Sequence, residues 1–329
     1  MDIEQPYQLL FLICTLLTLL THCGVLFIVV KKSPPSMKEY AQFLITPTLS
    51  EMIFTFLYGF VIMPEPPSYF PGCGYEIKGV VSQEFIPFSV SSVFFSVMFT
   101  YCSQFASLLY RFLAVQTNRQ LKTQFAKWNG RIYTFIFIVC LIPTIVFFNC
   151  VAQPEEFQDL IDAFNPNHPP VDLSVKRTII RHNNRLFHGL LLSLGFFLFL
   201  SYTLFIVLVI SILKTMKRNA NRFSRRTFLL SKQLTYCLIA QLITPLIVLV
   251  GPFFSLVVQI HTKPMDNRLR VQITSIVFCG HSLLSALAII TLIHPYRHFV
   301  LSFGQKLMCS RRVSGIKIMK ARSTFSTTV

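Results

Sequence analysis

Seven long apolar segments, separated by short polar stretches, dominate the pattern of this 329-residue chain. Each is close to the roughly 20 apolar residues that an α-helix needs to cross a lipid bilayer. The pattern therefore predicts an all-α membrane protein with seven spans, the sixth kinked by Pro245 and Pro252. The predicted spans cover residues 7–30, 41–63, 85–110, 132–151, 186–213, 234–260 and 271–294.

The first apolar segment is expected to remain in the protein as a span. Acidic residues, Asp2 and Glu4, precede it, and Lys31 and Lys32 follow it. A secretory signal peptide has a basic start and an apolar region of only about 7–15 residues. Both features therefore disagree with a signal peptide.

The composition agrees with a chain that lies mostly in lipid. Hydrophobic residues make up 53% of it and charged residues only 13%, whereas soluble domains carry about 25% charged residues. A chain so poor in charge cannot cover a surface that faces water.

The basic residues lie mainly on one side of the predicted membrane. Segments 31–40, 111–131, 214–233 and 295–329 together hold 22 Lys and Arg, and segments 1–6, 64–84, 152–185 and 261–270 hold 8. Basic residues gather in cytoplasmic loops, so we expect the N-terminus outside and the C-terminus in the cytoplasm. This distribution accounts for the net charge of +17 without a nucleic-acid partner. The excess faces the anionic leaflet and an internal protein partner.

The motifs of common enzymes and metal sites do not occur in the sequence. No P-loop, GxSxG or HExxH motif is present, and the nine cysteines form no CxxC pair. We therefore expect no enzymatic activity, no cofactor and no metal. No internal repeat is evident either, which disfavours a transporter built from inverted repeats.

The seventh segment ends in an unusual way, in TLIHPYRHFVLSF at residues 291–303. Pro295 is expected to break the helix at the membrane surface, with Tyr296 at the interface and Arg297 facing headgroups. Beyond it, Phe299, Phe303 and Leu307 recur every four residues. This spacing predicts a short amphipathic helix over 297–309 along the membrane, with Cys309 at its end as a palmitoylation site.

Several local motifs resemble those of nematode serpentine chemoreceptors, most closely class H, over nearly the whole chain. Class I and other sister classes remain alternatives. The third span ends in Tyr110-Arg111-Phe112, similar to the acidic-Arg-Tyr motif of G-protein-coupled receptors. The other motifs are SPPSMKEY at 33–40, IPTIVFFNCVAQPEE at 142–156, SRRTFLLSKQLTYCLIAQLITPLIVLVGPF at 224–253 and FCGHSLLSALAIITLIHPYRHFV at 278–300.

This resemblance implies a rhodopsin-like bundle of seven helices over residues 1–310, followed by a cytoplasmic tail over 311–329. Spans 2 and 7 are neighbours in such a bundle. Glu51 lies near the middle of the second span, where a carboxylate is costly unless it is protonated or paired. We therefore predict a polar core in which Glu51 bonds to His281, Ser282 or Ser285. The alternative is a neutral, satisfied glutamate with a purely structural role.

The resemblance also carries expectations that this sequence meets only in part. The usual receptor disulfide joins the outer end of span 3 to the second outer loop, but residues 152–185 contain no cysteine. Only Cys73 and Cys150 stand where such a bond could form. Span 2 carries Glu51 where the family usually has aspartate, and Tyr110 replaces the usual residue before the arginine.

The function that the resemblance implies is that of a chemosensory receptor in the plasma membrane, in the family often the ciliary membrane of a sensory neuron. It would bind a small, odorant-like ligand outside and activate a heterotrimeric G protein inside. The alternative is a ligand-gated channel or a transporter. Ligand contacts are expected from Ser92, Phe95, Phe99, His188, Gln259, Gln272 and His281. Partner contact or switching is expected from Arg111, Arg225, Arg226, Pro245, Pro295, Tyr296 and Arg297.

Overall fold

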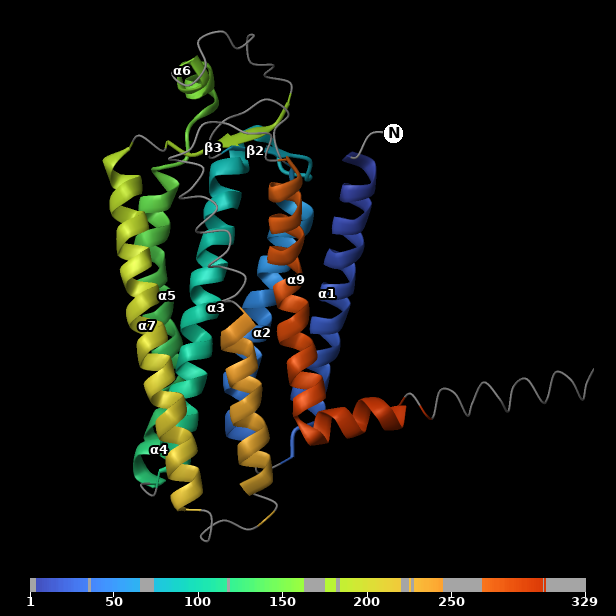
Figure 1. Cartoon of the computed structure of the whole chain (residues 1–329), viewed down its shortest axis with the longest axis vertical. Coiled ribbons are helices and arrows are strands. Elements are labelled where there is room, and N and C mark those ends of the chain that lie inside the picture. The colour runs from blue at the N-terminus through green and yellow to red at the C-terminus, as the bar shows by residue number, and fades with distance from the viewer. Residues whose placement is uncertain are drawn as a thin grey trace, which may run out of the picture.

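The structure is a computed structural model in which the helices stand side by side as one bundle (Figure 1). Among the residues that it describes, six helices are long and apolar enough to cross a membrane, and a shorter apolar one supplies the seventh. The predicted seven-helix membrane fold is thereby confirmed. The described residues are 4–34, 37–65, 74–116, 119–162, 175–181, 184–219, 225, 228–244, 268–303 and 305.

The seven membrane helices follow the predicted segments closely. They are α1 (Glu4–Lys32), α2 (Lys38–Phe56), α3 (Ile86–Val115), α5 (Asn129–Phe148), α7 (Arg185–Arg218), the helix Phe228–Thr244 and α9 (Arg268–Leu292). A π-helical turn, Leu57–Ile62, continues α2. The helix α7 runs five residues past its predicted span, where Lys217 and Arg218 favour the negative end of the helix dipole. The second half of the predicted sixth span lies outside the described residues.

One end of the bundle, here called the sheet end, carries a small antiparallel sheet. Its strands are β1 (Pro64–Glu65), β2 (Gly74–Ile77) and β3 (Arg177–Ile179), in the order β1-β2-β3. The short helix α6 (Phe157–Asp162) stands above it (Figure 1). No strand was expected, because each is too short to show a hydrophobic alternation. The pairing of β2 with β3 joins segments about a hundred residues apart, which local patterns do not reveal.

The opposite end, here called the tail end, carries α4 (Arg119–Lys127) and a helix over 294–303. This last helix, red in Figure 1, points sideways away from the bundle instead of continuing α9. The prediction of a short helix after the seventh span is thus supported, but its start is corrected. The chain bends at Ile293, and Pro295 lies in the first turn of the new helix. Proline is tolerated there because the first turn has no internal acceptor for its missing N–H.

Tyr296 corrects another expectation. Its side chain is fully buried in the core rather than placed at the membrane interface. Its hydroxyl is 2.7 Å from the hydroxyl of Ser33, next to the end of α1. Burial raises the pKa of Tyr296. Arg297 is exposed as expected, and the ammonium of Lys32 stands 4.9 Å from the ring of Phe299. Tyr296 thus holds the last helix against the end of α1.

The helices differ in how they present their apolar side chains. The outer faces of α5 and α7 expose large ones, including Leu192, Phe196 and Phe199, as expected for helices that face lipid. The interior instead holds many small polar side chains, most densely along α3. This helix packs against α2, α5 and α7 and occupies the centre of the bundle.

A substitution of Gly59, in the π-helical turn that continues α2, tests how tightly α1 and α2 pack. A β-carbon built at this position would collide with the side chain of Thr15 on α1, whereas one at Gly24 of α1 would meet nothing within 4 Å. We expect Gly59→Ala to destabilise the protein by about 1–3 kcal/mol through overpacking. The matched control Gly24→Ala should leave stability unchanged or raise it slightly. Thermal unfolding of the purified protein in lipid nanodiscs measures both; equal melting temperatures for the two variants would contradict this packing.

Candidate functional site

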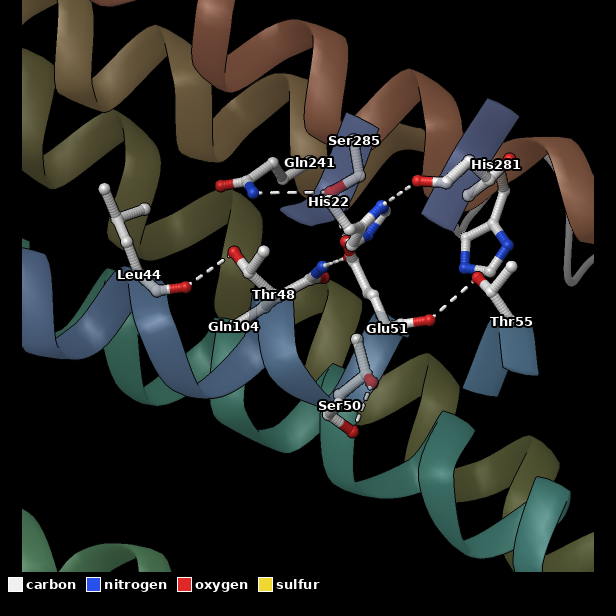
Figure 2. Close-up of polar contacts among 12 residues, drawn as sticks. His22, Leu44, Thr48, Ser50, Glu51, Thr55, Gln104, Gln241, His281 and Ser285 are labelled. Carbon is white, nitrogen blue, oxygen red and sulfur yellow. Dashed lines mark hydrogen bonds and ion pairs between the residues drawn. The ribbon is translucent and has the colours of Figure 1, made fainter. Parts of the chain in front are cut away.

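Glu51 of α2 lies at the centre of a polar cluster inside the bundle, with 1% of its surface exposed (Figure 2). Its Oε1 atom accepts two hydrogen bonds, from Nε2 of Gln104 on α3 and from the hydroxyl of Ser285 on α9, each at 2.8 Å. Its Oε2 atom lies 3.1 Å from Nε2 of His22 on α1. The carboxyl group is therefore satisfied by three other helices.

The hydrogen bonds of His22 limit where protons can lie in this cluster. Its Nδ1 atom is 3.0 Å from the carbonyl oxygen of Thr18, and a carbonyl only accepts, so Nδ1 carries a proton. The contact between Nε2 and Glu51 then holds one more proton, which belongs either to the imidazolium or to the carboxylic acid. In both cases the pair is neutral as a whole, which is the form that burial in lipid favours.

The cluster extends to the sixth membrane helix through Ser285. Gln241, on the helix Phe228–Thr244, donates from Nε2 to the Ser285 hydroxyl at 3.3 Å. One chain of hydrogen bonds thus runs from Gln241 through Ser285 to Glu51 (Figure 2). Together these bonds join α1, α2, α3, α9 and Phe228–Thr244, which are five of the seven membrane helices.

The polar face of α3 explains why Gln104 reaches Glu51. Polar residues recur at three- and four-residue spacing along α3 and share one side of the helix. They are Ser96, Thr100, Ser103, Gln104 and Ser107, all buried. Thr100 donates to the Ser50 hydroxyl at 2.8 Å, and Ser107 donates to the carbonyl of Phe43 at 2.7 Å. This stripe is the sequence signal that could have identified Gln104.

Of the three residues predicted to bond Glu51, the structure brings Ser285 into contact. The hydroxyl of Ser282 is buried without a hydrogen-bond partner among the described residues. The Nδ1 atom of His281 lies 2.6 Å from the carbonyl of Phe278, in its own helix, and its ring stands edge-on to Phe54. The expectation missed Gln104, for which the polar stripe of α3 was the available signal, and also His22 and Gln241, because a lone polar residue in an apolar run does not reveal its neighbours.

A small cavity adjoins Glu51. Its volume is about 10 Å³, close to the 10–15 Å³ that one water molecule needs. Its lining comes from α2, α3 and α9 and consists of Glu51, Phe54, Val97, Thr100, Tyr101, Gln104 and His281. In this conformation the cavity suits one water rather than an odorant-sized molecule.

Arg111, at the tail end of α3, is the second notable buried group, with 6% of its surface exposed. Its Nη2 atom donates to the carbonyl of Ser231 at 2.7 Å and lies 2.9 Å from the Ser231 hydroxyl. Its guanidinium also stands 5.3 Å from the ring of Tyr40. Arg111 thus joins α3 to the helix Phe228–Thr244. Among the described residues, no carboxylate forms an ion pair with it.

Tyr110 and Glu39 form a separate cluster beside Arg111. The Tyr110 hydroxyl donates to Glu39 at 2.8 Å, and Lys122 of α4 forms an ion pair with the same carboxylate at 2.7 Å. Two neighbouring residues of α3 therefore bond different elements: Arg111 bonds the sixth membrane helix, and Tyr110 bonds Glu39 of α2, which also pairs with Lys122 of α4.

Comparison with known families decides what kind of protein carries this bundle. A family model described as "Serpentine type 7TM GPCR chemoreceptor Srh" matches residues 2–306. The chain belongs to the Srh chemoreceptor family. A search of curated proteins found no match. The family membership confirms the expected receptor class and places the chain in a membrane, with several spans.

The predicted ligand-site residues that the structure describes in this Srh-family chain do not line one common cavity. His188 is exposed, and its Nδ1 atom lies 3.1 Å from the carbonyl of Asn184, the residue that caps the start of its helix. Phe95 and Phe99 pack on Phe137 of α5, so they fill a helix interface.

The other described ligand candidates, Ser92, Gln272 and His281, have different surroundings. The Ser92 hydroxyl donates to Phe88 within α3. Gln272 is buried at the sheet end of α9, and His281 lines the cavity beside Glu51. These two remain the candidates that the structure places inside the bundle.

Several predicted residues cannot be placed. Cys73, Arg226, Pro245, Gln259, Leu307 and Cys309 lie outside the described residues. Arg225 is exposed at the tail end. Cys150 is a buried free thiol whose sulfur lies 3.3 Å from the Val146 carbonyl, and its pairing with Cys73 stays a prediction. Among the described residues, no group of three His, Cys, Asp or Glu side chains is arranged to hold a metal.

Substitutions of Glu51 separate its charge from its hydrogen bonds. Glu51→Gln keeps an oxygen for Gln104 and Ser285, and its amide can donate to neutral His22, so we expect almost unchanged stability. Glu51→Ala leaves three buried partners unsatisfied and should cost roughly 3–5 kcal/mol. Thermal unfolding in nanodiscs measures both.

The exposed Glu84 on the same protein supplies the control, since Glu84→Ala removes a carboxylate that the described structure leaves at the surface. If Glu51→Ala melted at the same temperature as Glu84→Ala, the polar core would not contribute to the stability of the protein.

Proposed function

We propose that this chain is a chemosensory receptor that binds a small, mostly apolar ligand and activates a heterotrimeric G protein. The sheet end would face the outside and the tail end the cytoplasm, in agreement with the uneven distribution of basic residues. The family to which the chain belongs supports the chemosensory role.

The observation that carries the proposal is how the sixth membrane helix is held. Among the described residues, three side-chain contacts attach Phe228–Thr244 to other elements, besides a weak one from the Thr235 hydroxyl to the sulfur of Met216 at 3.7 Å. Arg111 of α3 bonds Ser231, the Gln233 side chain accepts from the backbone N–H of His294 at 3.2 Å, and Gln241 bonds Ser285. None of them is an ion pair. The two glutamine contacts join neutral groups and contribute only a modest net free energy each, whereas the bond from the Arg111 guanidinium is charge-assisted and stronger.

Such contacts suit a helix that changes position between two states. A ligand shifts a two-state equilibrium by binding one state more tightly than the other. Exchange of a few hydrogen bonds requires less free energy than breaking a buried ion pair. Outward movement of the helix would free Arg111 and the first turn of the last helix for a partner at the tail end.

Reconstitution of the receptor with purified G protein tests the proposal directly. Receptor in nanodiscs is exposed to a panel of small volatile compounds, and nucleotide exchange on the G protein is followed. We expect at least one compound to accelerate exchange in the wild type. A ligand-evoked ionic current in bilayers that contain the receptor and no G protein would overturn the proposal in favour of a channel.

Gln233→Ala tests the holding of the sixth helix without touching Arg111. Loss of the bond to His294 should destabilise the inactive state, in which the sixth helix is held as in this structure, by about 0.5–1.5 kcal/mol. Basal nucleotide exchange should therefore rise roughly two- to tenfold where the active fraction is small. Gln42→Ala, at an exposed glutamine of the same end, is the matched control. Basal exchange that matched the control would show that this contact does not restrain the helix.

A further inference from the structure

The loop between α5 and α7 is attached to the sheet end of α3 by two side chains that bond backbone groups. Strand β3 of this loop pairs with β2 of the preceding α2–α3 loop in the register Gly74↔Ile179, Tyr75↔Thr178 and Glu76↔Arg177. The backbone N–H of Ile77 then donates to the carbonyl of Lys176 at 2.8 Å. A pairing of three residues leaves the loop only weakly held by the sheet itself.

Gln83 extends this pairing from the start of α3. It lies in the 3-10 turn Gln83–Phe85 that leads into the helix. Its Nε2 atom donates to the carbonyl of Arg177 at 3.0 Å, and its Oε1 atom accepts from the Arg177 N–H at 3.1 Å. A primary amide offers the same donor and acceptor as a peptide group. Gln83 therefore pairs with Arg177 as a neighbouring strand would.

Lys176 makes the second attachment, in the opposite direction. Its ammonium donates to the carbonyl of Gly79 at 2.6 Å and to that of Val81 at 3.1 Å. Both carbonyls belong to the segment that joins β2 to α3. Gly79 fits there because a β-carbon would collide with the Val61 carbonyl, so this segment lies against the end of α2. Lys176 thus attaches the loop to the segment between β2 and α3.

The far side of the loop is held to the end of α5. Val151 pairs with Ile180, and the Arg181 N–H donates to the carbonyl of Cys150 at 2.8 Å. The Arg181 guanidinium also binds both carboxylate oxygens of Glu156 at 2.7 Å. This guanidinium holds the pKa of Glu156 below its usual value. Residues 176–181 are therefore bonded on both edges.

We propose that Gln83 and Lys176 form a non-covalent tether that fixes residues 176–181 to the sheet end of α3 and does the work of a disulfide there. All four bonds run between a side chain and backbone groups of another segment, and none involves a thiol. The position of the loop therefore withstands reducing conditions. This inference is independent of which ligand or G protein the receptor uses.

Amide hydrogen exchange on the intact receptor in nanodiscs tests the tether. The Arg177 amide is the reporter, because Gln83 accepts its hydrogen bond. We expect its exchange rate in the wild type to stay within about twofold when a phosphine reductant is added, and in the double variant Cys73→Ser, Cys150→Ser. Gln83→Ala should accelerate it by about tenfold or more, since two hydrogen bonds are lost.

Further variants keep the test clear if Gln83→Ala expresses poorly. Gln83→Glu still accepts from the Arg177 N–H but cannot donate to its carbonyl, so exchange should rise less than in Gln83→Ala. Lys176→Met removes the bonds to Gly79 and Val81 and should also accelerate exchange. Gln153→Ala, at an exposed glutamine of the same loop, is the matched control. Loss of protection on reduction, or full protection in both Gln83 variants, would overturn the proposal.

Discussion

A carboxyl group in the middle of an apolar bundle must be paired, and the pairing of Glu51 organises the interior of this receptor. A lone carboxylate in lipid is costly, so the bundle has to bring donors to it from other helices. His22, Gln104 and Ser285 supply them at 3.1, 2.8 and 2.8 Å. These three bonds fix the mutual rotation of α1, α2, α3 and α9, because a turn of any one helix by a single residue would remove its donor from reach. The shared proton between His22 and Glu51 lets the group stay neutral as a pair.

This polar centre separates two apolar regions with different tasks. Towards the tail end, a large core cluster includes Phe43, Leu108 and Tyr296. Towards the sheet end, a smaller cluster forms around Phe54 and Ile86. Apolar packing has no direction of its own and cannot by itself set the rotation of helices in lipid. The hydrogen bonds around Glu51 set the rotation of the helices about their axes, and the two clusters hold the helices together by apolar packing. The tether at Gln83 and Lys176 repeats the principle at the membrane surface, where side chains that bond backbone groups fix a loop of little apolar content.

The sequence allowed the spans to be predicted because each is an unbroken apolar run, a property that belongs to one segment alone. It also allowed the contact between Glu51 and Ser285 to be anticipated, since similar depth in adjacent spans limits the possible partners of a buried acid. His22, Gln104 and Gln241 were missed because depth does not tell which side of a helix faces the centre. Tyr296 was misplaced for the same reason: an aromatic residue at a membrane boundary suits both the interface and a core, and only the bend at Ile293 turns it inward. The sheet was missed because its strands are two to four residues long.

The bonds of the polar centre are unequal, and the inequality bears on how the receptor could change state. Glu51 receives its donors from α3 and α9 at 2.8 Å, whereas Gln241 of the sixth helix is joined to this network through Ser285, at 3.3 Å. A serine hydroxyl donates one proton and can accept others, so Ser285 keeps its bond to Glu51 whether or not Gln241 is present. Withdrawal of the sixth helix would therefore leave the carboxyl group fully satisfied and would cost only one weak bond at this level. In the proposed mechanism, four helices would therefore stay in place around Glu51, and Phe228–Thr244 would be the element that moves when a ligand binds.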